Sequence, residues 1–155
     1  MEPVPPAELL HDAEESFREI ARTHGIDLRI QDRPIPESLA AVLADREAIH
    51  QVFSNLIDNA LKYGASGGRI VLGARTVPRA VEFSVRDFGA GIASEHLPRL
   101  FERFYRVDKA RSRESGGTGL GLAIAKHIML AHGGSIRAES ELAHGAIFLF
   151  TLPSA

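Results

Sequence analysis

The chain has 155 residues, with 18 Lys and Arg against 20 Asp and Glu, and its formal net charge is −2. This length fits one domain, and the near-neutral charge argues against nucleic acid as the main partner, because proteins that bind nucleic acids usually carry a basic excess. The absence of cysteine excludes disulfides and cysteine-based zinc sites and agrees with a reducing cytoplasm, and no apolar run approaches the roughly 20 residues that a membrane-spanning helix needs.

The first third of the chain predicts a helix and two strands. After Pro5 and Pro6, apolar residues recur near one face of a helix that ends around His24-Gly25; they are Leu9, Ala13, Phe17 and Ile20. We expect this face to pack on the sheet. Residues 26–30 form an extended segment, and residues 39–43 read as a buried strand.

The second predicted helix has the clearest periodicity. Asp45 is a natural N-cap and Gly64 ends the helix. Its apolar residues recur at helical spacing; they are Ile49, Val52, Phe53, Leu56, Ile57, Ala60 and Leu61. Such a stripe predicts an amphipathic helix against a core.

Strands and one more helix are predicted in the rest of the chain. The predicted strands cover residues 69–76, 80–87, 135–139 and 146–152, with a helix over residues 118–132 and a short helical stretch after Ile92. Hairpins mixed with helices favour an α/β sandwich with a mixed sheet over a doubly wound parallel one.

The second helix also carries a polar stripe. Asn55, Asn59 and Lys62 are spaced i, i+4 and i+7, so they lie on one helix face. Asparagine is a mediocre helix former, an amide oxygen can coordinate Mg²⁺, and an ammonium group can meet phosphate oxygens. A solvated face is the alternative interpretation.

A second motif, Asp87-Phe88-Gly89-Ala90-Gly91-Ile92, follows a predicted strand. Glycines at alternate positions let the backbone turn sharply and approach a ligand. A carboxylate at the strand end can accept a hydrogen bond from an exocyclic amine, as selection of adenine requires. The alternative is a strand-terminating turn with a solvent-facing Asp87.

A third motif is the glycine-rich segment over residues 116–122, which runs into the third helix. Open backbone N–H groups and the helix dipole favour an anion at a helix start. The segment is neither a Walker A loop nor a dinucleotide fingerprint, because it lacks the Lys-Ser/Thr pair and its spacing is G-x-G-x-G. The alternative is a flexible hinge.

A fourth motif lies between them, over residues 100–111, and combines an aromatic cluster with basic residues. The aromatic side chains would anchor a lid over bound phosphates, and Arg106, Lys109 and Arg111 would close over them. A solvated run of charges is the alternative.

The order and spacing of the four motifs are far more specific than any one of them. Asn-x3-Asn-x2-Lys-Tyr, Asp-x-Gly-x-Gly, Phe-x-x-Phe-Tyr-Arg and Gly-x-Gly-x-Gly resemble the N, G1, F and G2 boxes of the histidine kinase catalytic domain, in the GHKL ATPase superfamily. The resemblance covers about residues 45–153. Residues 103–127 further resemble phosphate-responsive sensor kinases.

The resemblance implies a Bergerat fold, an α/β two-layer sandwich of a mixed five-stranded sheet and three helices. It implies one domain over residues 1–155, the catalytic ATP-binding domain, without the phosphoacceptor and dimerisation domain. His11 is followed by an acid, but the rest of the phosphoacceptor motif is absent, so we interpret His11 as a surface residue of the first helix.

The resemblance also assigns roles. Asn59, Lys62 and Arg106 would act in catalysis, with Asn59 as the main Mg²⁺ ligand and Asn55 beside it. Asp87 would bind the adenine amine. Phe101 and Phe104 would seat the lid. The other residues expected to contact ATP are Tyr63, Gly89, Gly91, Ile92, Arg111, Thr118, Gly119, Leu120, Gly121 and Leu122.

The implied function is transfer of the γ-phosphoryl group of Mg-ATP to a histidine on a separate phosphoacceptor domain, followed by transfer to a response regulator. The domain would be a cytoplasmic monomer that does not insert into a membrane, in a kinase whose full-length form can be anchored in the inner membrane. The alternatives are a nucleotide-binding regulatory module, a serine kinase of the anti-sigma-factor kind and a GHKL-type ATPase. The last is disfavoured because Asn55 stands where such enzymes have a water-activating glutamate.

Overall fold

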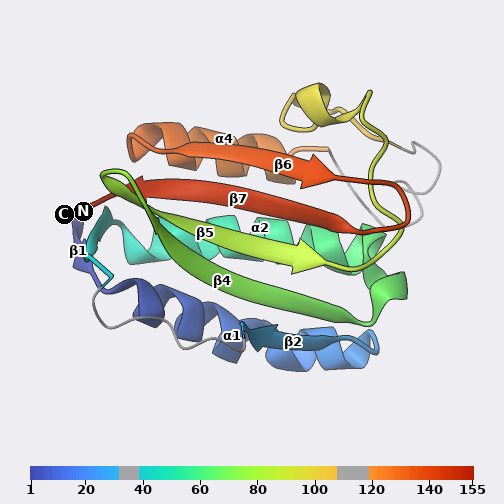
Figure 1. Cartoon of the computed structure of the whole chain (residues 1–155), viewed down its shortest axis with the longest axis horizontal. Helices are drawn as coiled ribbons and strands as arrows, with labels where there is room; N and C mark the ends of the chain where they lie inside the picture. Colours follow the sequence, from blue (N-terminus) through green and yellow to red (C-terminus); the bar gives the residue numbers. More distant parts are fainter. Residues whose placement is uncertain (32–38, 108–118) are drawn as a thin grey trace.

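A computed structural model describes residues 1–31, 39–107 and 119–155 (Figure 1). The strands are β1 (Glu2–Val4), β2 (Asp27–Ile30), β3 (Val42–Ala44), β4 (Arg69–Val77), β5 (Ala80–Asp87), β6 (Ser135–Ser140) and β7 (Ala146–Pro153). The α-helices are α1 (Pro6–Thr23), α2 (Arg46–Tyr63) and α4 (Gly121–Ala131), and short 3₁₀ turns occupy η1 (Ala65–Gly67) and η2 (Leu97–Arg99).

The main sheet has five strands in the order β2-β4-β5-β7-β6. β2 pairs with β4 in parallel, whereas the β4–β5, β5–β7 and β6–β7 pairs are antiparallel. The predicted mixed five-stranded sheet is therefore confirmed. A second, two-stranded sheet joins β1 to β3 near the chain ends (Figure 1).

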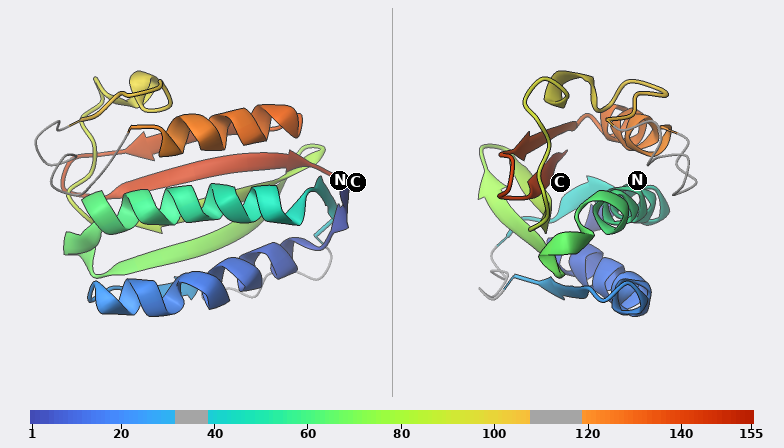
Figure 2. Two further views of the ribbon diagram at one scale, coloured as in Figure 1. Left: turned by 180° about the vertical axis from the view of Figure 1, so that it is seen from behind. Right: turned by 90° about the vertical axis from the view of Figure 1, so that its right-hand side faces the viewer.

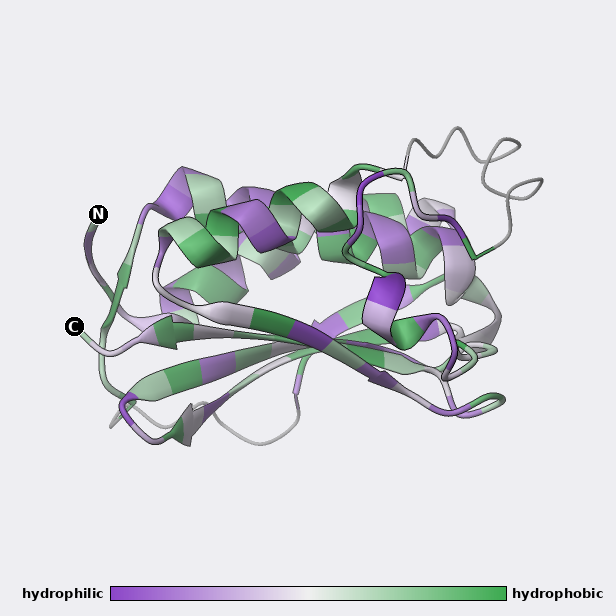
Figure 3. Ribbon diagram, turned by 90° about the horizontal axis from the view of Figure 1, so that it is seen from above, coloured by the Kyte–Doolittle hydropathy of each residue, from purple (hydrophilic) through white to green (hydrophobic). Residues whose placement is uncertain are grey.

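The three helices lie side by side on one face of this sheet, with α2 between α1 and α4 (Figure 2). The view along the layers in Figure 3 shows the two-layer sandwich that we predicted. In the described part of the chain, no helix is long and apolar enough to cross a membrane.

The core fills the space between the two layers. Along β5, Val81, Phe83 and Val85 are buried, as their alternation with polar residues predicts. Phe83 stacks on Phe150 of β7 at a centroid distance of 5.2 Å, and Phe53 of α2 meets Phe150 edge-on at 5.1 Å. These rings join α2 to the centre of the sheet, and so they fix the helix that carries the polar stripe.

Several predicted boundaries differ from the structure. β1 was not predicted, and β3 is shorter than the predicted strand over residues 39–43. In β3, Val42 and Ala44 are buried, but Leu43 between them is 40% exposed, because strand side chains alternate between two faces. On α1, the predicted Leu9 and Ala13 are buried against the core, whereas Ile20 is 48% exposed, so the predicted apolar stripe was wrong at that end.

Asp45 caps α2 as predicted, because its side chain accepts a hydrogen bond from the backbone N–H of Ala48 at 3.2 Å. We expect Asp45→Ala to lower the free energy of unfolding by about 1 kcal/mol, the usual value of an N-cap. Urea unfolding at neutral pH measures this change. Asp45→Ser is the matched control, since serine also caps; an equal loss in both variants would contradict the capping role.

Candidate functional site

The predicted motifs converge on the C-terminal half of α2. The end of α2, the end of β5 and the start of α4 all lie in the right-hand half of Figure 1. At Gly64, just after α2, a Cβ atom would stand 2.3 Å from Cγ of Asp87, so the end of α2 touches the end of β5. Asn55 of α2 donates from Nδ2 to the carbonyl oxygen of Gly121, the first residue of α4, at 3.0 Å.

Asp87 is the buried carboxylate of this region, with 5% of its surface exposed. Its Oδ1 accepts two backbone hydrogen bonds, from the N–H of Gly89 at 3.0 Å and from the N–H of Ala146 at 3.3 Å. Within the described residues, its Oδ2 accepts no hydrogen bond. The two backbone donors therefore orient the carboxylate and leave one oxygen for a ligand. The burial of Asp87 excludes the solvent-facing turn that was the alternative interpretation.

Two glycines let the backbone close around Asp87. A side chain at Gly64 would overlap the Asp87 carboxylate, and a Cβ at Gly145 would stand 2.2 Å from the Asp87 carbonyl oxygen. Gly145 also has a φ of +82°, which residues with a side chain rarely adopt. Close packing of this kind explains how Asp87 is buried beside a loop.

Burial raises the pKa of the Asp87 carboxyl above its ordinary range, and the hydrogen bonds from Gly89 and Ala146 offset only part of that effect. Ionisation of the Asp87 carboxyl at neutral pH therefore lowers the free energy of unfolding. Relative to Asp87→Asn, the wild-type free energy of unfolding should rise as pH falls from the raised pKa to the ordinary carboxyl range, then level off. Urea titrations of both proteins at several pH values measure the difference; parallel curves would contradict this assignment.

The turn after Asp87 is held from the β6–β7 loop. The backbone N–H of Ile92 donates to Oγ of Ser140 at 2.7 Å, and that hydroxyl donates to the carbonyl oxygen of Gly145 at 2.7 Å. Gly91 has a φ of +79°. Ile92 is half-buried against the core. The predicted turn is thus a fixed part of the site.

The polar stripe of α2 is half-buried. Among the described residues, the Asn59 side chain has no hydrogen-bond partner. Nζ of Lys62 lies 3.1 Å from a carboxylate oxygen of Asp58. Tyr63 is half-buried beside Gly64. The stripe therefore does not form the fully solvated face that was its alternative interpretation.

The amide of Asn55 is engaged on both sides. Oδ1 accepts from Nε2 of Gln51 at 2.7 Å while Nδ2 bonds Gly121. Asn59, in contrast, has no hydrogen-bond partner among the described residues, so its amide oxygen is available. Mg²⁺ takes such an oxygen together with water and phosphate oxygens. The residues present fit such an ion, although the described residues contain no cluster of three His, Asp or Glu that would hold a metal alone. The metal roles of Asn59 and Asn55 stay predictions.

α4 begins at Gly121, so its first N–H groups have no carbonyl partner within the helix. Gly119 precedes it with a φ of +75°, which is why the helix does not extend back to this residue. Gly119, Leu120 and Leu122 are half-buried. The predicted Arg111, Thr118, Gly116 and Gly117 lie outside the described residues.

The fourth motif behaves only partly as predicted. Phe101 is half-buried against the core and meets Phe148 edge-on at 6.2 Å. Phe104 is 68% exposed, so our prediction that it seats the segment was wrong. Its backbone N–H instead donates to the carbonyl oxygen of Gly119 at 2.8 Å, with a φ of +64°, and this conformation turns the ring outward.

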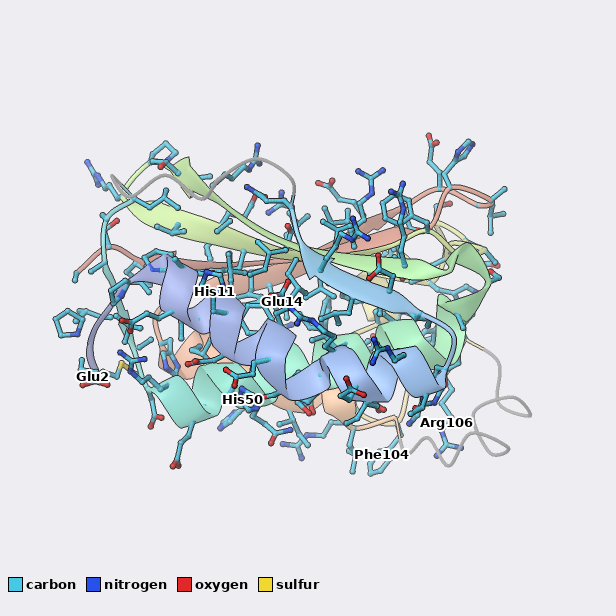
Figure 4. The ribbon with its side chains drawn as sticks, turned by 90° about the horizontal axis from the view of Figure 1, so that it is seen from below. Glu2, His11, Glu14, His50, Phe104 and Arg106 are labelled. Atoms are coloured by element: carbon cyan, nitrogen blue, oxygen red, sulfur yellow. The ribbon has the colours of Figure 1, made fainter. Side chains whose placement is uncertain are left out.

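Arg106 lies near Phe104 at the end of the molecule opposite Glu2 (Figure 4). Its Nε is buried and, among the described residues, has no hydrogen-bond partner. Tyr105 is held by a hydrogen bond between its hydroxyl group and Nδ1 of His96. The guanidinium of Arg99 also lies over the Tyr105 ring, 4.6 Å from its centroid. Tyr105 thus anchors the segment where Phe104 was expected to.

A separate groove of about 350 Å³ lies between α1 and the start of α2. It contains none of the predicted site residues. Its cation, Arg46, is bonded to Glu8 and Glu2, and His50 stacks on Phe17 with a centroid distance of 5.1 Å (Figure 4 labels Glu2 and His50). These partners explain the groove as packing between β1, α1 and α2. His11 is exposed on α1, as predicted.

Sequence reasoning missed four residues of the site. Gly64 and Gly145 were read only as the ends of a helix and a loop, and Gln51 and Ser140 were not singled out. The position of Gln51 one turn before Asn55 was a usable signal, since side chains at i and i+4 meet on a helix. The contacts of the other three join distant segments and left no local pattern.

Comparison with known proteins identifies a matching family and several relatives. The family described as "Histidine kinase-, DNA gyrase B-, and HSP90-like ATPase" matches residues 44–155. Sensor histidine kinase WalK of Bacillus subtilis is 46% identical over 123 residues, which are 78% of this chain and 20% of WalK. Sensor histidine kinase CusS of Escherichia coli K12 is 42% identical over 139 residues, 89% of this chain and 28% of CusS. The chain thus spans between a fifth and a third of these relatives.

Solved structures of histidine kinases also superimpose on this chain. Full-length ShkA in complex with AMPPNP superimposes with a TM-score of 0.83 and 33% identity, covering 99% of this chain and 31% of ShkA. The nucleotide-free catalytic domain of histidine kinase ThkA gives a TM-score of 0.79 and 32% identity, and covers 99% of this chain and 97% of that domain. The phosphate-responsive subclass stays a prediction.

Proposed function

We propose that this chain, which belongs to the family of histidine kinase-, DNA gyrase B- and HSP90-like ATPases, binds Mg-ATP and transfers its γ-phosphoryl group to a histidine. The acceptor histidine would lie on a phosphoacceptor domain of the full-length kinase, in two-component signal transduction. Two relatives that are about three to four times as long as this chain are sensor histidine kinases, and this supports such a division of labour.

The observation that carries the proposal is the orientation of Asp87. Its Oδ1 is held by two backbone N–H groups, and its Oδ2 accepts no hydrogen bond among the described residues. An ionised, oriented carboxylate oxygen is an acceptor for the exocyclic amine of adenine, and it disfavours the carbonyl group that guanine carries at the same position. This chemistry supports ATP over GTP.

With the adenine bound at Asp87, the triphosphate would extend along α2 to the start of α4. Asn59 and Lys62 lie on the intervening face of α2, and the N–H groups at the start of α4 are donors that suit phosphate oxygens. Tyr63, Gly89, Gly91, Ile92 and Leu122 would line this path together with Leu120. Arg111 and Thr118 belong to the proposed site by resemblance alone.

Asn59 would hold Mg²⁺, and the bound ion would neutralise charge on the phosphates. Arg106 would meet the γ-phosphate, and its buried Nε supports this role because a phosphate oxygen would satisfy that donor. Lys62 would bind the phosphates as a point charge. These groups position the phosphoryl group and stabilise its charge.

In the transfer, an imidazole nitrogen of the acceptor forms a bond to the γ-phosphorus. The bond from that phosphorus to the β–γ bridging oxygen breaks, and ADP leaves with the electron pair. The imidazole proton passes to a base on the acceptor domain or to water. The phosphohistidine would then phosphorylate a response regulator.

The domain would work in the cytoplasm, where ATP is available, and the full-length kinase would carry any membrane anchor. We infer that the acceptor domain docks near Phe104 and Ile124, which are apolar side chains exposed by 68% and 45%. The backbone of Phe104 is bonded to Gly119 just before α4, and Ile124 lies in the first turn of α4. An apolar surface of this kind fits a helical partner, and it would place the acceptor beside Arg106.

The test incubates the chain with γ-labelled ATP, Mg²⁺ and a separately expressed phosphoacceptor domain. We expect label on the acceptor in an acid-labile linkage that is stable to base, and no label with the Asn59→Ala variant. ATP binding without labelled acceptor would favour a regulatory nucleotide-binding module. Multiple turnovers of phosphate release without an acceptor would favour a hydrolytic ATPase.

A further inference from the structure

Two consecutive hydrogen bonds connect the exposed face of α2 to the first residue of α4. Nε2 of Gln51 donates to Oδ1 of Asn55 at 2.7 Å, and Nδ2 of Asn55 donates to the carbonyl oxygen of Gly121 at 3.0 Å. The two helices lie side by side in both views of Figure 2. Gln51 and Asn55 are one helical turn apart, so the pair is built into α2.

The direction of this chain of bonds is set by chemistry. A backbone carbonyl only accepts, so the Asn55 amide must present its nitrogen to Gly121. Its oxygen then faces Gln51, which must present a donor. In the opposite amide orientation, Oδ1 of Asn55 would face the Gly121 oxygen, and two acceptors would oppose each other.

We propose that Gln51 is a positioning residue for the nucleotide site. By donating to Asn55 Oδ1, it fixes the Asn55 amide in the orientation that holds Gly121, and it thereby keeps the first turn of α4 against α2. The inference rests on the proposed function where it concerns nucleotide affinity, because the start of α4 is the expected phosphate-binding end.

The same geometry assigns Asn55 a different role from the second Mg²⁺ ligand of our sequence-based prediction. With Gln51 in place, Oδ1 is occupied and Nδ2 is bonded, so Asn55 acts through Gly121. A Gln51 variant separates the two roles, because loss of Gln51 would free Oδ1 for a cation but would weaken the hold on Gly121.

The first experiment uses the nucleotide-free protein and hydrogen exchange of the Ile124 amide, which is bonded to the Leu120 carbonyl oxygen at 2.9 Å in the first turn of α4. Relative to wild type, we expect exchange about three- to tenfold faster in Gln51→Ala, the range that one neutral hydrogen bond gives. Gln51→Glu should exchange faster still, because a carboxylate accepts from Asn55 Nδ2 and turns the amide away from Gly121. Gln51→Lys, which retains a donor, should stay close to wild type.

This order distinguishes positioning from a merely structural role. Helix propensity alone would make the alanine variant of the helix more stable than wild type, and the glutamate variant about as stable as wild type. Gln51 is exposed, so the variants should fold.

The second experiment measures Mg-ATP affinity by calorimetry for the same series, in the wild-type and in the Asn55→Ala background. We expect a loss of about three- to tenfold for Gln51→Ala, a larger loss for Gln51→Glu, and no effect of either once Asn55 is absent. A non-specific charge effect on the nucleotide would persist in the Asn55→Ala background.

Two results would overturn the proposal. Tighter Mg-ATP binding by Gln51→Ala would mean that Oδ1 is a metal ligand that Gln51 blocks, and unchanged exchange at Ile124 would mean that Gln51 does not hold α4. If exchange follows the expected order but no variant binds ATP, the positioning role stands and the proposed function fails.

Discussion

Replacing Asn59 with alanine is expected to abolish Mg²⁺-dependent binding of adenine nucleotides, with an affinity loss of at least about 100-fold. Mg²⁺ takes few protein ligands beside phosphate oxygens and water, so loss of one ligand removes much of the protein's hold. Outer-shell partners of metal ligands already contribute about 10- to 100-fold, and a direct ligand should contribute no less.

The helix itself should not suffer from this change, because alanine is a better helix former than asparagine. Asn59 has no hydrogen-bond partner among the described residues that alanine would remove. A loss of binding would therefore report on the ligand site and leave the fold intact.

Calorimetry of ADP and ATP binding, with Mg²⁺ and with a chelator, measures the effect. Glu47→Ala is the matched control, since Glu47 is exposed on the same helix three turns earlier and contacts none of the predicted site. Equal Mg²⁺ dependence in wild type and Asn59→Ala would show that Asn59 does not hold the ion.

The second large effect is expected at Asp87. In Asp87→Asn, the amide oxygen can keep the hydrogen bonds from Gly89 and Ala146, so the NH₂ group takes the position of Oδ2. A donor then faces the donor of the adenine amine. ATP affinity should fall about 10- to 100-fold, the value of a hydrogen bond to a charged group, while GTP affinity should hold or rise.

Competition binding of ATP and GTP to the same protein gives the ratio directly. Asp12→Asn, an identical chemical change on an exposed part of α1, controls for the loss of one negative charge. An unchanged ratio in Asp87→Asn would mean that adenine is selected elsewhere, even if both nucleotides bound more weakly.

The fold was largely predictable, and α2 shows why. Its apolar repeat from Ile49 to Leu61 is buried as the period implies, because a 3.6-residue repeat brings such residues onto one face. Asp45 and Gly64 bound the helix through local hydrogen bonds and so left local signals. β1 had no such signal, since a three-residue strand exists only through its partner β3.

The candidate site was predictable in its residue types and not in its contacts. The sequence placed Asp87 at the end of a strand, but Asp87 is buried because Gly64 and Gly145, distant in the chain, close on it. His132 gives a similar case. Its Nδ1 meets the carbonyl oxygen of Ile128 at 2.8 Å and its Nε2 accepts from the Asp45 N–H at 3.2 Å, joining the end of α4 to the start of α2.

The sequence by itself thus determined the family, the mixed α/β fold and the residue types of the candidate site, because period, glycine placement and motif spacing are properties of the local chain. Only the tertiary structure decided which oxygen of Asp87 is available, that Asn55 bonds Gly121, and that Phe104 points outward while Tyr105 anchors its segment. Those outcomes depend on hydrogen bonds and close approaches between segments far apart in the chain, and the folded packing alone brings such segments together.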